Sequence, residues 1–113
     1  MARLAGTARL FRLLSDKNRL RLLKLIEHEQ SFCAELALVV GLSYSTVCRH
    51  LKFMTAAGLI HKIKSRYRIY YTLAPKTSLG GKLARMACAG LEDDKRIIKD
   101  KRVFEKDKYS ARR

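Results

Sequence analysis

The sequence predicts a mainly α-helical domain of the α+β class, in which four helices, a β-hairpin and a fifth helix follow one another. Apolar residues recur at helical spacing over most of the chain, and two segments in the middle alternate apolar and polar residues as strands do. A chain of 113 residues is long enough for one hydrophobic core but short for two. We therefore expect a single domain over residues 1–91 and a charged tail over 92–113 that is either a helical extension or disordered.

The first two helices are predicted from the spacing of their apolar residues. In residues 4–14 apolar side chains return every three or four positions with arginines between them, which is typical of an amphipathic helix. Ser15 or Asp16 is a suitable N-cap for the second helix, whose leucine-rich stretch ends at the polar residues 28–30. The broad apolar face of this second helix predicts that it lies in the core.

Two helices joined by a tight turn are predicted next. Ser31 is the expected N-cap of a short helix over 32–40, and Gly41 ends it because glycine tolerates a left-handed backbone. Ser43 caps the following helix, which is predicted to cover residues 44–57. This arrangement is typical of the helix-turn-helix, whose second helix enters the major groove of DNA.

The second helix of this pair has one apolar face and one polar, basic face. Helical spacing places Val47, Leu51 and Met54 together on the packed side. On the polar side Arg49 is the best candidate for a base contact, because a guanidinium can donate two hydrogen bonds to guanine, although it can equally bind a phosphate. His50 lies at the edge of the apolar face, where packing and DNA contact are both open. The predicted DNA contacts of this helix are Ser43, Tyr44, Ser45, Thr46, Cys48, Arg49, His50 and Lys52.

Residues 59–64 and 67–73 are predicted to form the two strands of a hairpin. The second strand alternates apolar residues with Arg68, Tyr70 and Thr72, so it has one apolar face. The hairpin carries no acidic residue, and its cations suit a wing that lies along a phosphate backbone; a solvated hairpin with incidental charge is the alternative. These wing cations are Lys62, Lys64, Arg66 and Arg68.

The last predicted helix follows Pro75 and runs from Ser78 to about Leu91, with Gly80 and Gly81 weakening its first turn. This helix and the first one both carry apolar stripes that so small a protein cannot easily bury alone, which favours a homodimer. A two-fold dimer would bind a pseudo-palindromic DNA site. The predicted dimer contacts are Leu4, Ala8, Phe11, Leu79, Leu83, Met86 and Ala87.

Composition points to an anionic partner and away from other classes. The formal net charge is +15, and residues 36–91 include nine lysines or arginines and no acidic residue, which predicts attraction to a polyanion. No apolar run approaches the roughly 20 residues of a membrane span, and the N-terminus does not resemble a signal peptide, so we expect a soluble intracellular protein. The chain has no phosphate-binding glycine loop and no ordered nucleophile and base, which argues against an enzyme.

Two other classes compete with a DNA-binding protein that recognises a specific sequence. A nonspecific architectural or RNA-binding basic protein would have the same net charge but equal affinity for all sequences. A module that binds a protein partner through its charged tail is the other alternative.

Residues 8–74 resemble the ArsR/SmtB family of winged-helix repressors in the order and spacing of their motifs. The motifs are LFRLLSD at 10–16, RLRLL at 19–23, GLSYSTVCRHL at 41–51, AGLI at 57–60 and YYTL at 70–73. The resemblance implies a winged helix-turn-helix fold, dimerisation through the first and last helices, and repression that an inducer relieves. It also implies a nucleoid-associated protein of the prokaryotic cytoplasm. At the wing tip the family has glycine where this chain has Arg66, which predicts a wider turn.

The resemblance also implies where a metal inducer would bind, and this chain lacks both places. Many relatives bind a soft metal through two cysteines at the start of the third helix, and those positions are Phe32 and Ala34 here, with Cys33 between them. A second family site uses Asp and His on the fifth helix, but no histidine follows His61. We therefore expect no metal at either site and name no certain cofactor.

The three cysteines, Cys33, Cys48 and Cys88, form no CxxC pair and are predicted to be reduced thiols. Each can be a small packed residue. The alternative is a sensor for a metalloid or an oxidant. Cys48 favours it because it lies on the DNA face near cations that would stabilise a thiolate, and Cys33 with Cys88 is a candidate switchable pair.

Overall fold

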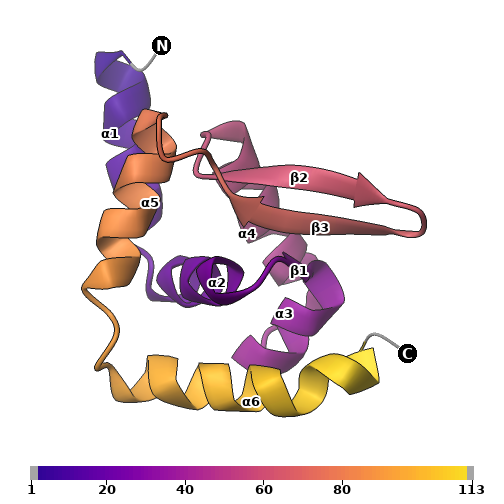
Figure 1. Ribbon diagram of the computed structural model, residues 1–113. Coiled ribbons are helices and arrows are strands. Elements are labelled where there is room, and N and C mark those ends of the chain that lie inside the picture. The colour runs from indigo at the N-terminus through magenta and orange to yellow at the C-terminus, as the bar shows by residue number, and fades with distance from the viewer. Residues whose placement is uncertain (1–2, 112–113) are drawn as a thin grey trace.

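The structure is a computed structural model that describes residues 3–111, and the side chains of these up to residue 107. Its elements, in chain order, are α1 (Leu4–Leu14), α2 (Lys17–His28), β1 (Ser31–Phe32), α3 (Cys33–Val40), α4 (Tyr44–Ala56), β2 (Ile60–Ser65), β3 (Arg68–Leu73), α5 (Leu79–Ala89) and α6 (Lys95–Ala111) (Figure 1). The predicted α+β winged-helix class is confirmed. The short strand β1 is an addition to the predicted elements, and α6 occupies most of the charged tail.

Helix α2 forms the centre of the core, with α1 and α5 side by side at one end and α6 running beneath α2 and α3, on the side away from the hairpin (Figure 1). Its N-cap is Asp16, whose carboxylate accepts a hydrogen bond from the Arg19 N–H at 3.0 Å. Its residues 22–26 are all buried, and four of these five are Leu or Ile. The fifth, Lys24, reaches Glu27 and Glu92 with its ammonium group, so that a buried stem ends in ion pairs.

Ser31 is not the N-cap of α3, as was expected, because Ser31 and Phe32 form strand β1. Ser31 pairs with Tyr71 and Phe32 with Tyr70 of β3, and the Ser31 hydroxyl donates to the Glu29 carbonyl at 2.6 Å. At the start of α3 it is instead Glu35 that provides a hydrogen-bond acceptor: its carboxylate accepts from the Phe32 backbone N–H at 3.1 Å.

The three strands form an antiparallel sheet in the order β1-β3-β2, from which the β2–β3 hairpin projects away from the helices (Figure 1). The prediction of a wider turn at the wing tip is wrong. Ser65 pairs with Arg68, so only Arg66 and Tyr67 form the turn, and Tyr67 belongs to the turn instead of the strand. Arg66 fits there because, in residues 3–111, only Gly41 and Gly58 have a positive φ, so this turn does not need glycine.

Helix α5 begins after Ser78, whose hydroxyl accepts from the Gly81 N–H at 3.0 Å. Its two glycines lie where the helix approaches other backbone most closely. A Cβ on Gly80 would lie 2.0 Å from the Gly58 carbonyl oxygen, and one on Gly81 would lie 2.0 Å from that of Pro75. The glycines that weaken this helix in isolation therefore let it pack against the preceding loops.

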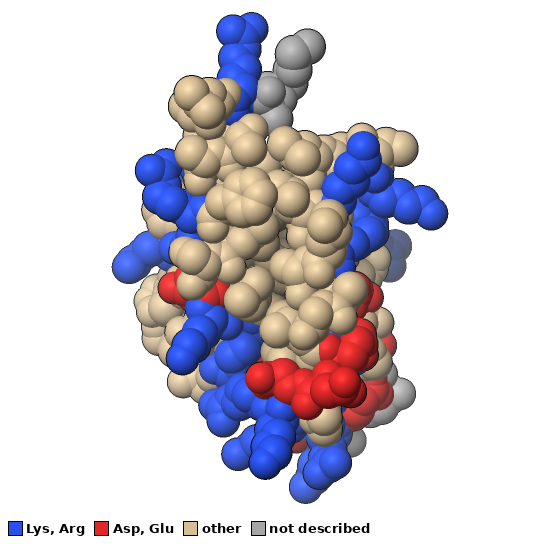
Figure 2. Space-filling model, turned by 90° about the vertical axis from the view of Figure 1, so that its left-hand side faces the viewer, with Lys and Arg blue, Asp and Glu red and all other residues tan. Residues whose placement is uncertain are grey.

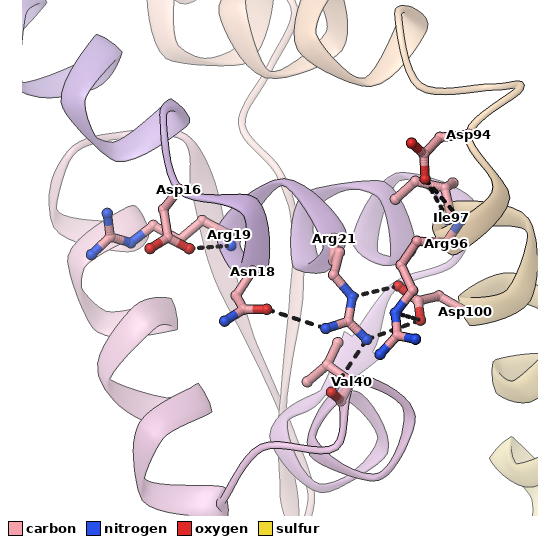
Figure 3. Close-up of polar contacts among 9 residues, drawn as sticks. All are labelled: Asp16, Asn18, Arg19, Arg21, Val40, Asp94, Arg96, Ile97 and Asp100. Atoms are coloured by element: carbon pink, nitrogen blue, oxygen red, sulfur yellow. Dashed lines mark hydrogen bonds and ion pairs between the residues drawn. The ribbon is translucent and has the colours of Figure 1, made fainter.

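Helix α6 packs across α2 and α3 and completes the core with Ile97 and Phe104, which are both buried. A buried ion pair fixes its position: the Arg21 guanidinium donates to both Asp100 carboxylate oxygens, at 2.8 and 3.0 Å (Figure 3). The same guanidinium donates to the Asn18 side chain and to the Val40 carbonyl, at the end of α3. Arg21 thus joins three helices.

Within residues 3–111 no helix is both long enough and apolar enough to span a membrane.

Candidate nucleic-acid interface

Helix α4 presents one side to the core and the other to solvent. Val47, Leu51 and Met54 are completely buried. On the opposite side Tyr44, Ser45, Arg49 and Lys52 are exposed, whereas Thr46, Cys48 and His50 are half-buried at the edges. The exposed residues form a continuous polar strip that includes two cations, as helical spacing predicts.

The first turn of α4 is held rigidly by its own hydroxyl groups. The Ser43 side chain accepts from the Thr46 N–H at 3.1 Å and donates to the Thr46 hydroxyl at 2.8 Å, and it lies 3.3 Å from the Ser45 hydroxyl. Free N–H groups and the positive end of the helix dipole make such a terminus favourable for phosphate. This turn can therefore anchor the helix on a nucleic-acid backbone.

His50 lies half-buried at the edge of the polar strip and connects α4 to α2. Its Nδ1 accepts a hydrogen bond from the Arg19 Nε–H at 3.1 Å. Burial, together with the positive charges of Arg19 and Arg49, lowers the pKa of His50. The neutral ring thus acts as a hydrogen-bond acceptor that links α4 to α2, while its contact with DNA stays a prediction.

The hairpin places three of its four predicted cations in solvent. Lys62, Lys64 and Arg66 are exposed. Arg68 differs, because it is half-buried and its guanidinium lies over the Phe32 ring, 4.4 Å from the ring centroid. The cation–π contact therefore holds the tip-side end of β3 against β1, and it was not predicted because Phe32 lies on another strand.

Tyr67 was not predicted as a site residue, yet it is 90% exposed at the tip of the wing. It lies between Arg66 and Arg68 in the sequence. A large aromatic side chain in solvent, next to a cation, suits contact with a sugar or base. The signal available in the sequence was its place at the centre of the hairpin turn.

A cavity of about 610 Å³ separates the hairpin from the first turns of α3 and α4. From the helices it is lined by Cys33, Tyr44 and Cys48, and from the hairpin by Lys64 and Arg66 among others. The polar strip of α4 and the basic wing are thus neighbours on one side of the molecule.

The structure brings Cys33 and Cys48 together. Their Sγ atoms are 2.8 Å apart, and the Cys33 thiol also lies 3.7 Å from the Tyr44 carbonyl oxygen, to which it donates. Burial, and then the hydrogen bond with Cys48, raises the pKa of the Cys33 thiol. Hydrogen bonding to Cys48 is also the main cause that raises the pKa of Tyr44.

The candidate pair of Cys33 and Cys88 is replaced by this contact between Cys33 and Cys48. Cys88 lies in α5 and is completely buried in the core. Burial raises its pKa to about 12, so it remains a protonated, packed thiol. The pairing escaped prediction because the two partners lie 15 positions apart on different helices.

Among the described residues, no group of three or more His, Cys, Asp or Glu side chains is arranged to hold a metal ion. Phe32 contributes a ring to the packing at the start of α3, where it meets Tyr70 edge-on with 5.6 Å between centroids. Ala34 is exposed beside it.

A second surface, formed by α1 and α5, is apolar. Figure 2 shows this side of the molecule as a broad area without charged side chains, bordered by lysines, arginines and a cluster of acids. Of the predicted dimer contacts, Leu4, Phe11, Leu79 and Met86 are between 38% and 90% exposed, Ala8 is exposed, and Leu83 and Ala87 are half-buried. An exposed apolar patch of this kind marks an interface.

Comparison with known proteins identifies related sequences. Residues 16–62 match the family described as bacterial regulatory protein, arsR family. The chain is 31% identical over 62 residues to the cadmium resistance transcriptional regulatory protein CadC of Listeria innocua. That match covers 54% of this chain and 52% of CadC, so the chain spans about half the length of the curated relative.

Solved structures share the fold over a larger part of the chain. A homodimeric winged helix-turn-helix DNA-binding domain from Mycobacterium bovis, a possible ArsR-family regulator, has a TM-score of 0.68 at 21% identity, covering 81% of this chain and 83% of that one. An ArsR-like transcriptional regulator from Rhodococcus has a TM-score of 0.60 at 25% identity, covering 93% and 92%.

Proposed function

We propose that this chain, whose residues 16–62 match the arsR family of bacterial regulatory proteins, is a transcriptional repressor that binds double-stranded DNA as a homodimer. Its place of action would be the cytoplasm, where bacterial DNA lies. The observation that carries the proposal is the position of the polar strip of α4 beside the basic hairpin, on either side of one cavity. A helix in the major groove and a wing on the adjacent backbone need this arrangement.

The two parts of this surface have different tasks. Arg49 and Lys52, with the hydroxyl groups of the first turn, are in a position to meet base edges and nearby phosphates. Lys62, Lys64 and Arg66 extend from the body of the protein and would neutralise phosphates whatever the sequence. Specificity is therefore assigned to α4 and salt-sensitive affinity to the wing.

Selection of bound sites from random double-stranded DNA tests the proposal. A winged-helix dimer should enrich a pseudo-palindrome whose half-sites lie about one helical turn, or a multiple of it, apart. Enrichment of no motif, or equal affinity for all duplexes or for RNA, would instead identify a nonspecific architectural or RNA-binding protein.

The proposed dimer is tested through the apolar surface of α1 and α5. Phe11 and Met86 are 57% and 72% exposed, so Phe11→Asp with Met86→Asp should leave the fold intact and convert the dimer into a monomer in analytical ultracentrifugation. Leu38→Asp is the matched control, because Leu38 is an equally exposed apolar residue (58%) on α3, outside the surface. A control that dissociates the dimer as strongly would place the interface elsewhere.

A further inference from the structure

Two thiols are in close contact at the proposed DNA-binding surface, where Cys33 belongs to the core and Cys48 packs against its edge. Cys33 begins α3, and Cys48 lies one turn inside α4, the helix assigned to the major groove. Their sulfur atoms, at 2.8 Å, are nearer to each other than non-bonded sulfur atoms normally lie, and a disulfide would require about 2.05 Å. The two sulfur atoms therefore need to move only a short distance closer to form a covalent bond.

The two thiols differ in exposure, which suits a pair with one attacking and one resolving cysteine. Cys48 is half-buried and lines the open cavity between α4 and the hairpin, so small molecules in solvent can reach it. Cys33 is 7% exposed and lies behind it. Lys64, Arg66 and Arg68 line the same cavity and would attract anions into it.

We propose that Cys33 and Cys48 are a dithiol that a hydroperoxide converts to an intramolecular disulfide, and that this disulfide weakens DNA binding. In the first step the Cys48 sulfur attacks the peroxide, the O–O bond breaks, and the products are a Cys48 sulfenic acid and an alcohol, or water from hydrogen peroxide. In the second step the Cys33 sulfur attacks the sulfenic sulfur, and the hydroxyl leaves with the Cys33 proton as water. The peroxide is reduced and the two thiols are oxidised by two electrons in total.

The disulfide acts on the end of α4 that meets DNA. The Cys33 thiol donates to the carbonyl of Tyr44, the first residue of α4, and disulfide formation removes this donor. Disulfide formation also shortens the distance between the two sulfur atoms from 2.8 Å to about 2.05 Å, which pulls α4 toward the start of α3. Binding surfaces tolerate displacements of only about 0.5 Å, so Tyr44 and Ser45 would leave their positions against the groove.

The chemical half of the proposal is tested by peptide mapping of the full protein. Residues 25–49 contain no Lys or Arg before Arg49, so trypsin releases Cys33 and Cys48 in one peptide, while Cys88 lies in another. After treatment with hydrogen peroxide and blocking of free thiols, this peptide should be about 2 Da lighter than its unblocked reduced form and should carry no blocking group. A reductant should restore both labelling sites. A blocked Cys33 with a twice-oxidised Cys48, or a disulfide between protomers, would overturn the proposal.

The regulatory half, which rests on the proposed function, is tested by DNA binding of the same samples. Oxidised protein should bind a selected operator at least about tenfold more weakly than reduced protein, as if one good base contact were lost. The ratio between oxidised and reduced affinities is compared within each variant. It should fall to one in Cys33→Ser and in Cys33→Ala and should persist in Cys88→Ser, the matched control for a buried thiol.

The results separate the two levels of inference. If reduced protein selects no DNA sequence, the proposed repressor is wrong and the regulatory half fails with it, while the mapped disulfide reports on the dithiol alone. If reduced protein binds its operator and the mapped disulfide leaves that affinity unchanged, only the regulatory half is wrong. Circular dichroism of each variant verifies that α-helix content is retained.

Discussion

Arg49 is the residue on which sequence discrimination is expected to depend most. It is exposed in the middle of α4, and a bidentate contact with guanine contributes about 1 to 3 kcal/mol of discrimination. Arg49→Ala should therefore lower the free-energy difference between specific and nonspecific binding by that amount, which competition titrations measure. Arg102→Ala is the control, since Arg102 is an equally exposed arginine on α6. An unchanged ratio in Arg49→Ala would assign this guanidinium to a phosphate.

His50 predicts a dependence of stability on pH. Burial and the charges of Arg19 and Arg49 lower its pKa in the folded protein, whereas unfolded histidine titrates near 6.5. As pH falls below about 6.5, the unfolded chain binds the proton first, so the free energy of unfolding should decrease. Urea unfolding of wild type and His50→Gln at several pH values between 7.5 and 5 measures this, and the variant should show the flatter profile. A steeper loss in the variant would contradict it.

Individual site residues were predictable where local periodicity decides their position. The faces of α4 follow from the 3.6-residue helical repeat, so exposed Arg49 and buried Leu51 were both anticipated. Contacts across the fold were not, because nothing local brings Arg68 to Phe32 or Cys33 to Cys48. Such pairs are fixed by tertiary packing alone.

At the scale of elements, the start of α5 depends on close approach of backbone. Gly80→Ala would improve helix propensity by about 1 kcal/mol, yet its Cβ would lie 2.0 Å from the Gly58 carbonyl oxygen. The clash involves backbone and cannot be relieved by rotating a side chain, so we expect a net loss of about 2 kcal/mol in the free energy of unfolding. Thermal or urea unfolding measures it.

Gly6→Ala is the matched control for this prediction. Gly6 also lies inside a helix, α1, but a Cβ there would meet nothing within 4 Å. The substitution should therefore stabilise the protein by about 0.5 to 1 kcal/mol. If both variants were equally stabilised, the close approach of α5 to the preceding turn would be wrong.

The attachment of α6 depends on the Arg21–Asp100 pair. The Asp100 side chain is 4% exposed, and its removal would leave a largely buried guanidinium without its carboxylate, which typically costs about 3 kcal/mol. Asp100→Ala should thus lower the midpoint of urea unfolding strongly, and Asp93→Ala, at an exposed position just before α6, should change it little. In the double variant Arg21→Leu with Asp100→Leu the loss should be smaller, because no buried charge remains.

Predictability of the elements follows the length of their local signal. The helices from α1 to α5 and both wing strands carry several periods of apolar residues and were anticipated to within a few residues. Strand β1 has only two residues and exists because β3 pairs with it, so its serine was assigned to a helix cap instead. For the charged tail, the sequence did not decide between a helix and disorder. Ile97 and Phe104 pack α6 onto the core, but in the sequence they are widely spaced among charged residues.

For the whole molecule, charge distribution separates the two proposed surfaces. The α1 and α5 side is apolar at its centre (Figure 2), which suits a second copy. The hairpin carries cations without acids. With a net charge of +15, a monomer would be drawn to any nucleic acid, so we expect selectivity to come from the base contacts of α4 and from the spacing of the two α4 helices in the proposed dimer.

The same charge predicts how affinity responds to salt. Lys64 and Arg66 are exposed on the wing, and each phosphate contact contributes about 0.9 to the slope of log affinity against log salt concentration. Lys64→Ala with Arg66→Ala should therefore flatten the slope by up to about 1.8 per protomer and weaken operator and random DNA alike. Fluorescence anisotropy over a range of KCl concentrations measures both effects. Lys99→Ala with Arg102→Ala removes the same charge from α6, and an equal flattening there would show that overall charge, not the wing, sets the salt dependence.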